Sequence, residues 1–415
     1  MNNITSIILL PNKEESIKRF HPWIFSGAIA HIEGEANEGD IVKVFNHKRA
    51  PLAIGHYAGG SIAVRILTFD TGEEIDSIFW QKRLSKAWEL RKSCKLMRYS
   101  ENNGKEDYIS TAHMPSTPNN VFRLVHGEGD RLPGLIIDVY GDTAVMQAHS
   151  AGMHHVRMDI AEALMKVSQG SLKAVYYKSE GTLPFKANLD VHDGFLIGHT
   201  EAVPVEENGI KFYPDWIKGQ KTGFFIDQRD NRSLLEFYAS GRKVLNMFCY
   251  TGGFSLYALR GGAIQVDSVD SSAKAMHLTK ENVSLNFAQD DERHRAITAD
   301  AFEFLEQMEQ NSYDLIVLDP PAFAKHRKVL RNALIGYRKI NTIAFKKIAP
   351  GGILFTFSCS QAVSKEEFRL AVFSAAAASG RHVRILHQLI QPADHPINIY
   401  HPEGEYLKGL VLQVE

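Results

Sequence analysis

The fold is decided by the segment Val244-Leu245-Asn246-Met247-Phe248-Cys249-Tyr250-Thr251-Gly252-Gly253, in which an apolar strand runs into paired glycines. A helical pattern follows at residues 254–260, and the chain then alternates between short strands and helices up to residue 379. Two further strand-like runs lie at residues 382–389 and 407–414. Alternation with short links predicts an α/β fold with a doubly wound, mostly parallel sheet. Such sheets bind ligands at the carboxyl ends of their strands.

Acidic residues stand at the ends of the next three predicted strands. Asp270 lies eighteen residues past Gly252, Asp300 follows the third strand, and Asp319 ends the fourth. A carboxylate at the first position can accept hydrogen bonds from both hydroxyls of a ribose, and one at the second could bind an adenine amino group. Taken alone, an Asp at the end of a strand is about as often a helix cap as a ligand-binding residue. The ordered set nevertheless predicts an adenosine ligand with a cationic tail, for which S-adenosylmethionine is the obvious candidate.

The segment before this sheet, residues 212–232, is dense in polar and aromatic side chains. Lys221 and Arg229 could hold a carboxylate, and Phe224 or Phe225 could cover an adenine. The alternative is an ordered loop that caps the following helix. The residues predicted to bind S-adenosyl-L-methionine, with S-adenosyl-L-homocysteine as the product, are Lys221, Thr222, Gly223, Phe224, Asp227, Arg229, Asn246, Phe248, Tyr250, Thr251, Gly252, Gly253, Asp270, Ser271, Asp300, Ala301 and Asp319.

The fifth predicted strand leads into Cys359 and neighbours the strand that ends at Asp319. A thiolate at this position could add to C6 of a pyrimidine and make C5 nucleophilic enough to take a methyl group. Asp319 could hold the base edge and protonate N3, which stabilises the adduct. The alternative is a structural cysteine, because free Cys is among the most buried residue types. We predict Cys359 and Asp319 as the catalytic residues.

The other two cysteines have different predicted roles. Cys249 lies on the glycine turn and is expected to pack beneath the ligand, whereas Cys94 lies in a basic helix and is expected to be structural. Three scattered cysteines are too few for a disulfide framework or a zinc site. No metal is therefore expected.

The tripeptide Asp319-Pro320-Pro321 also suits enzymes that methylate exocyclic amines. Those enzymes resemble one another in having an aromatic residue directly after the prolines, where it stacks on a flipped base. Here Ala322 takes that position and the aromatic residue is Phe323. This difference, together with Cys359, favours C5 of cytosine over an amine.

The charge of the chain is balanced as a whole but not locally. A net charge of -1 over 415 residues gives no sign of a nucleic-acid partner. Residues 320–365, however, contain nine Lys or Arg and no Asp or Glu, and they bracket the proposed chemistry. A solvated surface is the usual reason for such a run, but this one predicts a phosphate-binding surface. The predicted RNA contacts are Pro320, Pro321, Phe323, Lys325, Arg327, Lys328 and Arg331.

The length of 415 residues predicts two or three domains, because a chain this long can bury several large cores. Short strands punctuated by glycines predict a small β-barrel over residues 1–72. A helix at residues 73–97 opens a central α+β domain over residues 73–190, and the parallel sheet belongs to a domain over residues 191–415. The first residues do not form a signal peptide, and no apolar run could span a membrane. We expect a cytoplasmic protein without membrane contact, and the sequence leaves a homodimer open.

Several motifs give the chain a resemblance to a known family over essentially its whole length. They are Arg19-Phe20-His21-Pro22-Trp23-Ile24-Phe25-Ser26-Gly27-Ala28, Gly127-Glu128-Gly129-Asp130-Arg131-Leu132-Pro133-Gly134, Lys221-Thr222-Gly223, Asp227-Gln228-Arg229-Asp230, Tyr250-Thr251-Gly252-Gly253-Phe254, Asp319-Pro320-Pro321, Phe357-Ser358-Cys359-Ser360, Ala393-Asp394-His395-Pro396 and Pro402-Glu403-Gly404. The sequence resembles the PUA-domain-containing, S-adenosylmethionine-dependent rRNA large-subunit methyltransferases that make 5-methylcytosine.

This resemblance implies a PUA-like RNA-binding barrel, a central α+β domain and a Rossmann-like class I methyltransferase domain. It also implies Cys359 as the nucleophile and large-subunit (23S) rRNA as the partner. Many RNA cytosine-C5 enzymes resemble each other in a second cysteine after the Asp-Pro, where this chain has Pro321-Ala322, so the group that removes the C5 proton is unassigned. The loop at residues 100–120 has no counterpart in the family pattern.

Two other functions compete with this one. The first is methylation of another RNA base or atom, with the same cofactor site and a structural Cys359. The second is a non-catalytic RNA-binding assembly factor, against which the intact cofactor motifs argue.

Overall fold

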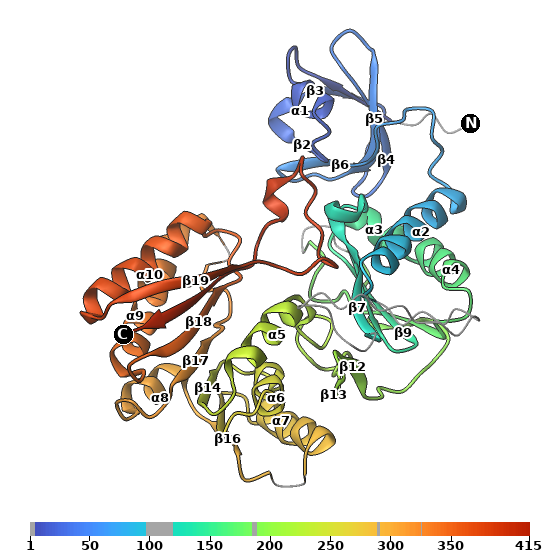
Figure 1. Cartoon of the computed structure of the whole chain (residues 1–415). Coiled ribbons are helices and arrows are strands. Elements are labelled where there is room, and N and C mark those ends of the chain that lie inside the picture. Colours follow the sequence, from blue (N-terminus) through green and yellow to red (C-terminus); the bar gives the residue numbers. More distant parts are fainter. Residues whose placement is uncertain (1–4, 97–118, 185–188, 289–290, 325) are drawn as a thin grey trace.

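A computed structural model of the chain describes residues 5–96, 119–184, 189–288, 291–324 and 326–415. Figure 1 shows three parts: a small β structure at the top, a second sheet with helices at the right, and a larger sheet with helices at the lower left. The predicted loop at residues 100–120 falls almost entirely outside the described residues. Among the described helices, none combines the length and apolarity needed to cross a bilayer.

The first part is a six-stranded sheet in the order β2-β6-β5-β4-β1-β3. Strand β4 alternates along its length, so that Val42 and Val44 enter the core of this part. The sequence predicts four of the strands but misses β2 and β3, because β2 has only three residues and β3 is largely exposed. The elements are β1 (Ser6–Leu9), α1 (Glu15–Lys18), β2 (Trp23–Phe25), η1 (Ser26–Ala28), β3 (Ile29–Glu33), β4 (Ile41–Phe45), β5 (Pro51–Tyr57) and β6 (Ile62–Thr68).

The second part is a five-stranded sheet in the order β11-β10-β9-β8-β7. Its first helix begins four residues later than predicted, because the Asp76 side chain caps it by accepting hydrogen bonds from the backbone N–H groups of Ile78 and Phe79. The helix predicted at about residues 155–167 is α4, which begins two residues later, and the short helix α3 before it is not predicted by the sequence. The elements are α2 (Ser77–Ser93), β7 (Val121–His126), η2 (Gly127–Asp130), β8 (Leu135–Tyr140), β9 (Thr143–Ala148), α3 (Ala151–His155), α4 (Arg157–Val167), β10 (Ala174–Tyr177) and β11 (Gly194–Ile197).

The third part is a seven-stranded sheet in the order β16-β15-β14-β17-β18-β20-β19. Neighbours from β16 to β18 are parallel, and β20 is antiparallel to both β18 and β19. This confirms the predicted doubly wound, mostly parallel sheet. The elements are the hairpin β12 (Val205–Glu207) and β13 (Ile210–Phe212), η4 (Ile226–Gln228), α5 (Arg229–Tyr238), β14 (Lys243–Met247), α6 (Gly253–Arg260), β15 (Gln265–Asp270), α7 (Ala273–Asn286), β16 (His294–Thr298), α8 (Ala301–Gln307), β17 (Leu315–Leu318), η5 (Arg327–Val329), α9 (Leu330–Lys347), β18 (Gly352–Ser358), α10 (Lys365–Ser379), β19 (Val383–Leu389), η6 (Pro402–Gly404) and β20 (Lys408–Val414).

Helices cover both faces of this sheet because its strands are apolar on both sides. Leu245 packs in a core with residues of α8, α9 and α10. Its neighbour Val244 points to the opposite face and packs in a core with residues of α5 and α6. In the pairing of β17 with β18, Leu318 lies opposite Thr356. The residues that follow these strands, including Asp319 and Cys359, therefore emerge at one edge of the sheet.

The segment between β19 and β20, residues 390–407, connects the three parts. Figure 1 shows it as a red loop that leaves the large sheet and reaches the barrel near β2. Asp394 in this segment accepts hydrogen bonds from Arg229 Nη1 at 2.9 Å and from the backbone N–H of Arg123 at 3.0 Å. A Cβ atom on Gly129 would lie 1.9 Å from the carbonyl oxygen of Pro396. The contact of η2 with this segment therefore requires glycine at position 129.

Candidate active site

The turn after β14 is held in an uncommon backbone conformation. Phe248, Tyr250 and Gly252 have φ values of +57°, +47° and +82°. The Asp270 carboxylate fixes this turn by accepting hydrogen bonds from the backbone N–H groups of Tyr250 at 3.0 Å and Ser272 at 2.9 Å. A Cβ atom on Gly252 would lie 2.7 Å from Thr279 Cγ2. Non-glycine residues at positive φ are strained and often mark ligand sites.

A cavity of about 220 Å³ opens above this turn, at the carboxyl ends of β14, β15 and β17. We refer to it as the strand-end cavity. Most of the predicted cofactor residues line it, and so do the two prolines that follow Asp319. The predicted residues found there are Lys221, Phe224, Asp227, Phe248, Tyr250, Thr251, Gly253, Asp270, Ser271, Asp319, Pro320, Pro321 and Cys359.

Arg229 corrects one part of the cofactor prediction. Its guanidinium is 2% exposed and pairs with Asp394 at 2.9 Å and Glu207 at 3.5 Å, and it also donates to the carbonyl of Val121. The Arg229 guanidinium is therefore paired with carboxylates, and it links residues of the second and third parts of the chain. It does not line the strand-end cavity and is unable to hold a cofactor carboxylate there.

Five more predicted cofactor residues lie beside the strand-end cavity rather than in its lining. Thr222 is buried and donates a hydrogen bond to Asp138 Oδ2 at 2.6 Å. Asn246 donates to Ser255 Oγ at 2.9 Å beneath the turn. Gly223, Gly252 and Ala301 shape the backbone at turns and helix starts.

Asp300 caps helix α8, as a strand-end Asp often does. Its Oδ1 accepts hydrogen bonds from the backbone N–H groups of Phe302 and Glu303. Asp300 is exposed and does not line the strand-end cavity. Binding of an adenine amino group by Asp300 stays a prediction.

The carboxyl group of Asp319 is positioned by a side chain that sequence reasoning missed. Gln228 Nε2 donates a hydrogen bond to Asp319 Oδ2 at 3.0 Å. Burial, followed by the nearby negative charge of Asp227, raises the pKa of Asp319 to about 7, while Gln228, Lys221 and Arg232 oppose the shift. Near neutral pH a substantial fraction of Asp319 is therefore protonated and able to donate a proton.

Cys359 lies beside Asp319, as their neighbouring strands predict. Its Sγ lies 3.9 Å from the carbonyl oxygen of Pro320. The pKa of the Cys359 thiol is raised to about 11. Burial is the largest cause and the negative charge of Asp319 the next, whereas the positive charge of Lys221 opposes the shift. The thiol form dominates in this state of the protein, so a thiolate requires help from neighbouring charges.

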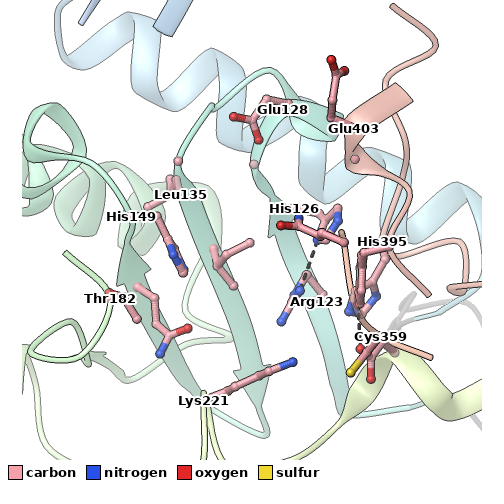
Figure 2. Close-up of a pocket in the computed structure, with 18 of the residues that line it drawn as sticks. Arg123, His126, Glu128, Leu135, His149, Thr182, Lys221, Cys359, His395 and Glu403 are labelled. Atoms are coloured by element: carbon pink, nitrogen blue, oxygen red, sulfur yellow. Dashed lines mark hydrogen bonds between the residues drawn. The ribbon is translucent and has the colours of Figure 1, made fainter. Parts of the chain in front are cut away.

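A second cavity of about 590 Å³ meets the first at Cys359, and we refer to it as the junction cavity. All three parts of the chain contribute to its walls, with Trp23 from β2, His126 from β7 and His395 from the 390–407 segment. Figure 2 shows the Lys221 side chain extending across the cavity on the side of Arg123 and Cys359. The residues that line both cavities are Lys221, Phe224, Phe225, Asp227 and Cys359.

Phe323, predicted to contact the RNA, is partly buried, and that contact stays a prediction. Its ring packs against Tyr337, with ring centroids 4.7 Å apart, and lines neither cavity. Arg327, Lys328 and Arg331 are exposed, as a phosphate-binding surface requires. Lys325 lies outside the described residues.

The other two cysteines differ in their position relative to the site: Cys249 lines the strand-end cavity together with Cys359, whereas Cys94 does not. Cys249 is buried in a small cluster with Ala275 and Met276 beneath the turn, and burial raises the pKa of its thiol well above the usual value. Cys94 ends helix α2. The described residues contain no group of three or more His, Cys, Asp or Glu that could hold a metal ion.

Sequence reasoning gave no role to three polar residues of this site: Gln228, Tyr406 and Lys408. Tyr406 donates a hydrogen bond to Asp227 Oδ2 at 2.6 Å, and Lys408 donates to the carbonyl of Ser360 at 2.7 Å. In the sequence, Gln228 is marked only by its place in the motif Asp227-Gln228-Arg229-Asp230. Tyr406 lies at the end of the 390–407 segment and Lys408 begins β20, and no local pattern marks either residue as functional.

Comparison with known proteins gives a consistent result. Residues 186–400 match the family described as S-adenosylmethionine-dependent methyltransferase, and residues 7–69 match the PUA-like domain. The chain is 40% identical over 412 residues to "Ribosomal RNA large subunit methyltransferase I" of Aeromonas salmonicida, with 98% of each chain covered. It is 37% identical over 413 residues to the protein of the same name from Klebsiella pneumoniae, again with 98% of each covered.

Solved structures agree with the fold. A chain from Streptococcus mutans, provisionally assigned as a SAM-dependent methyltransferase, superposes with a TM-score of 0.80 at 20% identity, covering 99% of this chain and 100% of that one. A provisionally assigned methyltransferase complexed with SAH has the same scores and coverage.

Proposed function

Because the chain belongs to the S-adenosylmethionine-dependent methyltransferase family and its relatives are named ribosomal RNA large subunit methyltransferase I, we propose that it methylates C5 of a cytosine in large-subunit (23S) rRNA. One observation supports this proposal above all others: Cys359 lies where the strand-end cavity meets the junction cavity. A nucleophile at this point reaches a base in one cavity while the methyl donor occupies the other.

The strand-end cavity fits S-adenosylmethionine. Asp270 closes β15 at the cavity wall, and the left-handed turn at Gly252 brings backbone close to a ligand. When bound, this cofactor supplies an electrophilic methyl group. Phe224 and Phe225 line both cavities and give the site apolar walls.

The chain's own residues supply the activation of the base. The Cys359 thiol passes its proton to ionised Asp319, and the thiolate Sγ forms a bond to C6 of cytosine. The electron pair displaced from the C5–C6 double bond moves through the ring to N3, which takes the proton from Asp319. C5 is then an enamine-like carbon that would take the methyl group, with S-adenosyl-L-homocysteine as the leaving group. The methylated adduct still carries the original hydrogen on C5 and a bond from C6 to sulfur, so both must be removed.

The decisive experiment is bisulfite sequencing of 23S rRNA from cells with and without this gene. We expect one cytosine to lose its protection from deamination in the deletion strain and to regain it when the gene is restored. A cytosine map that does not change on deletion would reject the proposal.

Asp270 should control cofactor affinity. In Asp270→Ala we expect the dissociation constant for S-adenosylmethionine to rise about 10- to 100-fold, because one or two charge-assisted hydrogen bonds to the ligand disappear and the turn at Tyr250 loses its anchor. Isothermal titration calorimetry measures the change. Glu281→Ala on α7, outside the cavity lining, is the matched control and should bind normally.

The exposed basic residues Arg327, Lys328 and Arg331 should contribute to RNA binding by contacting phosphates. Replacing Lys328 and Arg331 by glutamine should weaken RNA binding and reduce the slope of log K against log salt by about 0.7–0.9 for each phosphate that the protein no longer neutralises. Filter binding over a range of salt concentrations measures this slope. Lys166→Gln on α4 is the control, and a slope that stays unchanged in the double variant would contradict the assignment.

We further propose that the protein acts in the cytoplasm, where rRNA is made in bacteria such as the sources of its relatives. Its domains are proposed as residues 1–72, 73–190 and 191–415, with one adjustment: β11 pairs with β10 in the central sheet, so the third domain begins after Ile197. A homodimer stays a prediction, which the molar mass from light scattering tests.

A further inference from the structure

The proposed reaction needs a base that removes the C5 proton, and the family pattern leaves this base unassigned. It must stand close to both the nucleophile and the methyl donor, because the methyl group and the proton are bound to the same carbon. Among the residues that line both cavities, Lys221 is a cation, Cys359 is the nucleophile and two are phenylalanines. Asp227 is the carboxylate in this shared set.

Asp227 is held in place from two directions. It lies in η4, directly before α5, and is buried. The hydroxyl of Tyr406 donates a hydrogen bond to its Oδ2 at 2.6 Å. Within the described part of the chain, Oδ1 receives no hydrogen bond, while the side chain lines both cavities. One carboxylate oxygen is therefore anchored and the other is free to accept a proton.

The charges around Asp227 keep it ionised. Burial alone would raise its pKa, but Lys221, His395, Tyr406 and Arg123 together lower it below the usual value. Asp319 experiences the opposite balance, with its pKa raised to about 7. Two carboxyl groups whose pKa values are pushed apart are suited to separate acid and base roles. The titratable groups that face Asp227 are Arg123, Lys221, Asp319, Cys359, His395 and Tyr406.

We propose that Asp227 is the base that accepts the C5 proton, with Tyr406 as the residue that positions it. This role rests on the proposed function. The Asp227 carboxylate takes the proton from C5, and the electron pair of that C–H bond forms the C5–C6 double bond. The C6–Sγ bond breaks and its electron pair returns to Cys359 as thiolate. The proton on N3 returns to Asp319, so the only proton released is the one that Asp227 later passes to solvent.

The test uses 23S rRNA labelled with tritium at C5 of cytosine, with the full-length enzyme and S-adenosylmethionine. In Asp227→Asn we expect tritium release to fall at least about 100-fold, the usual lower range for loss of a general base. Because methyl transfer precedes proton removal, a methylated protein–RNA adduct should accumulate and survive on a denaturing gel. Wild-type protein should show rapid release and little adduct.

Tyr406→Phe gives a second, milder test. It removes the hydrogen bond that stabilises ionised Asp227, so the pKa of Asp227 rises and the acidic limb of the pH profile for tritium release moves to higher pH. Tyr400→Phe, in the same segment and exposed, is the control and should leave the profile in place. An acidic limb that does not move in Tyr406→Phe contradicts the positioning role.

Three results would overturn the assignment. Tritium release at the wild-type rate in Asp227→Asn would show that another group removes the proton. Loss of S-adenosylmethionine binding without an adduct in this variant would assign Asp227 to the cofactor instead. If the wild-type protein itself released no tritium, the proposed function would fail, and the role of Asp227 with it.

Discussion

Cys359→Ala is expected to abolish methyl transfer to rRNA. Without the thiolate, C5 of cytosine is too weak a nucleophile, so the rate should fall at least about 1,000-fold, as it does when other enzymes lose a covalent nucleophile. Cofactor affinity should change little, because Asp270 and the glycine turn remain. Transfer of a radiolabelled methyl group to 23S rRNA measures the rate, and calorimetry measures the affinity.

Cys94→Ala is the matched control, since Cys94 lies at the end of α2 and lines neither cavity. It should methylate at the wild-type rate. Full retention of methyl transfer in Cys359→Ala would reject the C5 mechanism and favour methylation of another base or atom. If the wild-type protein did not bind S-adenosylmethionine at all, a non-catalytic RNA-binding role would be favoured.

The proton on Asp319 and the thiolate of Cys359 should support each other. Ionised Asp319 is one reason why the pKa of Cys359 reaches about 11, after burial itself. Protonation of Asp319 removes this negative charge and leaves Lys221 as the dominant nearby charge. The acid needed at N3 and the nucleophile needed at C6 are therefore favoured in the same microstate of the coupled pair.

Much of the fold could be predicted because it depends on local patterns. The sequence predicts strands at residues 265–270 and 352–358 and a helix at residues 365–379, and β15, β18 and α10 have these bounds to the residue. Helix α10 even begins with a capping box at Ser364 and Glu367. The missed strands β2 and β3 are short or exposed, and their pairing partners lie elsewhere in the chain.

The errors in the site have a different cause. Arg229 looks like a ligand-binding cation in sequence, but its partner Asp394 lies 165 residues away and takes up its charge in the interior. Phe323 stays a predicted RNA contact, but its ring packs against Tyr337 on α9, which the local sequence does not predict. Local sequence shows which residue types are present, whereas long-range packing decides which of them remain free to bind a ligand.

Arg229 and Asp394 also lead to the largest expected effect on stability. Asp394 is fully buried, accepts hydrogen bonds from Arg229 and from the backbone of Arg123, and receives one on its own carbonyl from Arg91. Asp394→Ala leaves the buried guanidinium of Arg229 without its nearest carboxylate. The free energy of unfolding should fall by about 3–5 kcal/mol, which urea denaturation measures. Glu33→Ala, which breaks an exposed pair with Arg49, should leave the urea midpoint nearly unchanged.

The same carboxyl group should make the protein sensitive to acid. Burial would raise the pKa of Asp394, but Arg229 and His395 outweigh it and hold that pKa well below the ordinary value of 3.8. The stabilisation is therefore fully present above about pH 4 and is lost as the pH falls further, when the unfolded chain binds the proton more readily than the folded one. Asp394→Ala should lose this part of the acid dependence, and a variant that kept the wild-type dependence would show that Asp394 does not hold the parts together. Residues 390–407 also place His395 and Tyr406 in the junction cavity. Loss of Asp394 should therefore disorganise the part of the site that holds the cytosine before it disturbs the strand-end cavity.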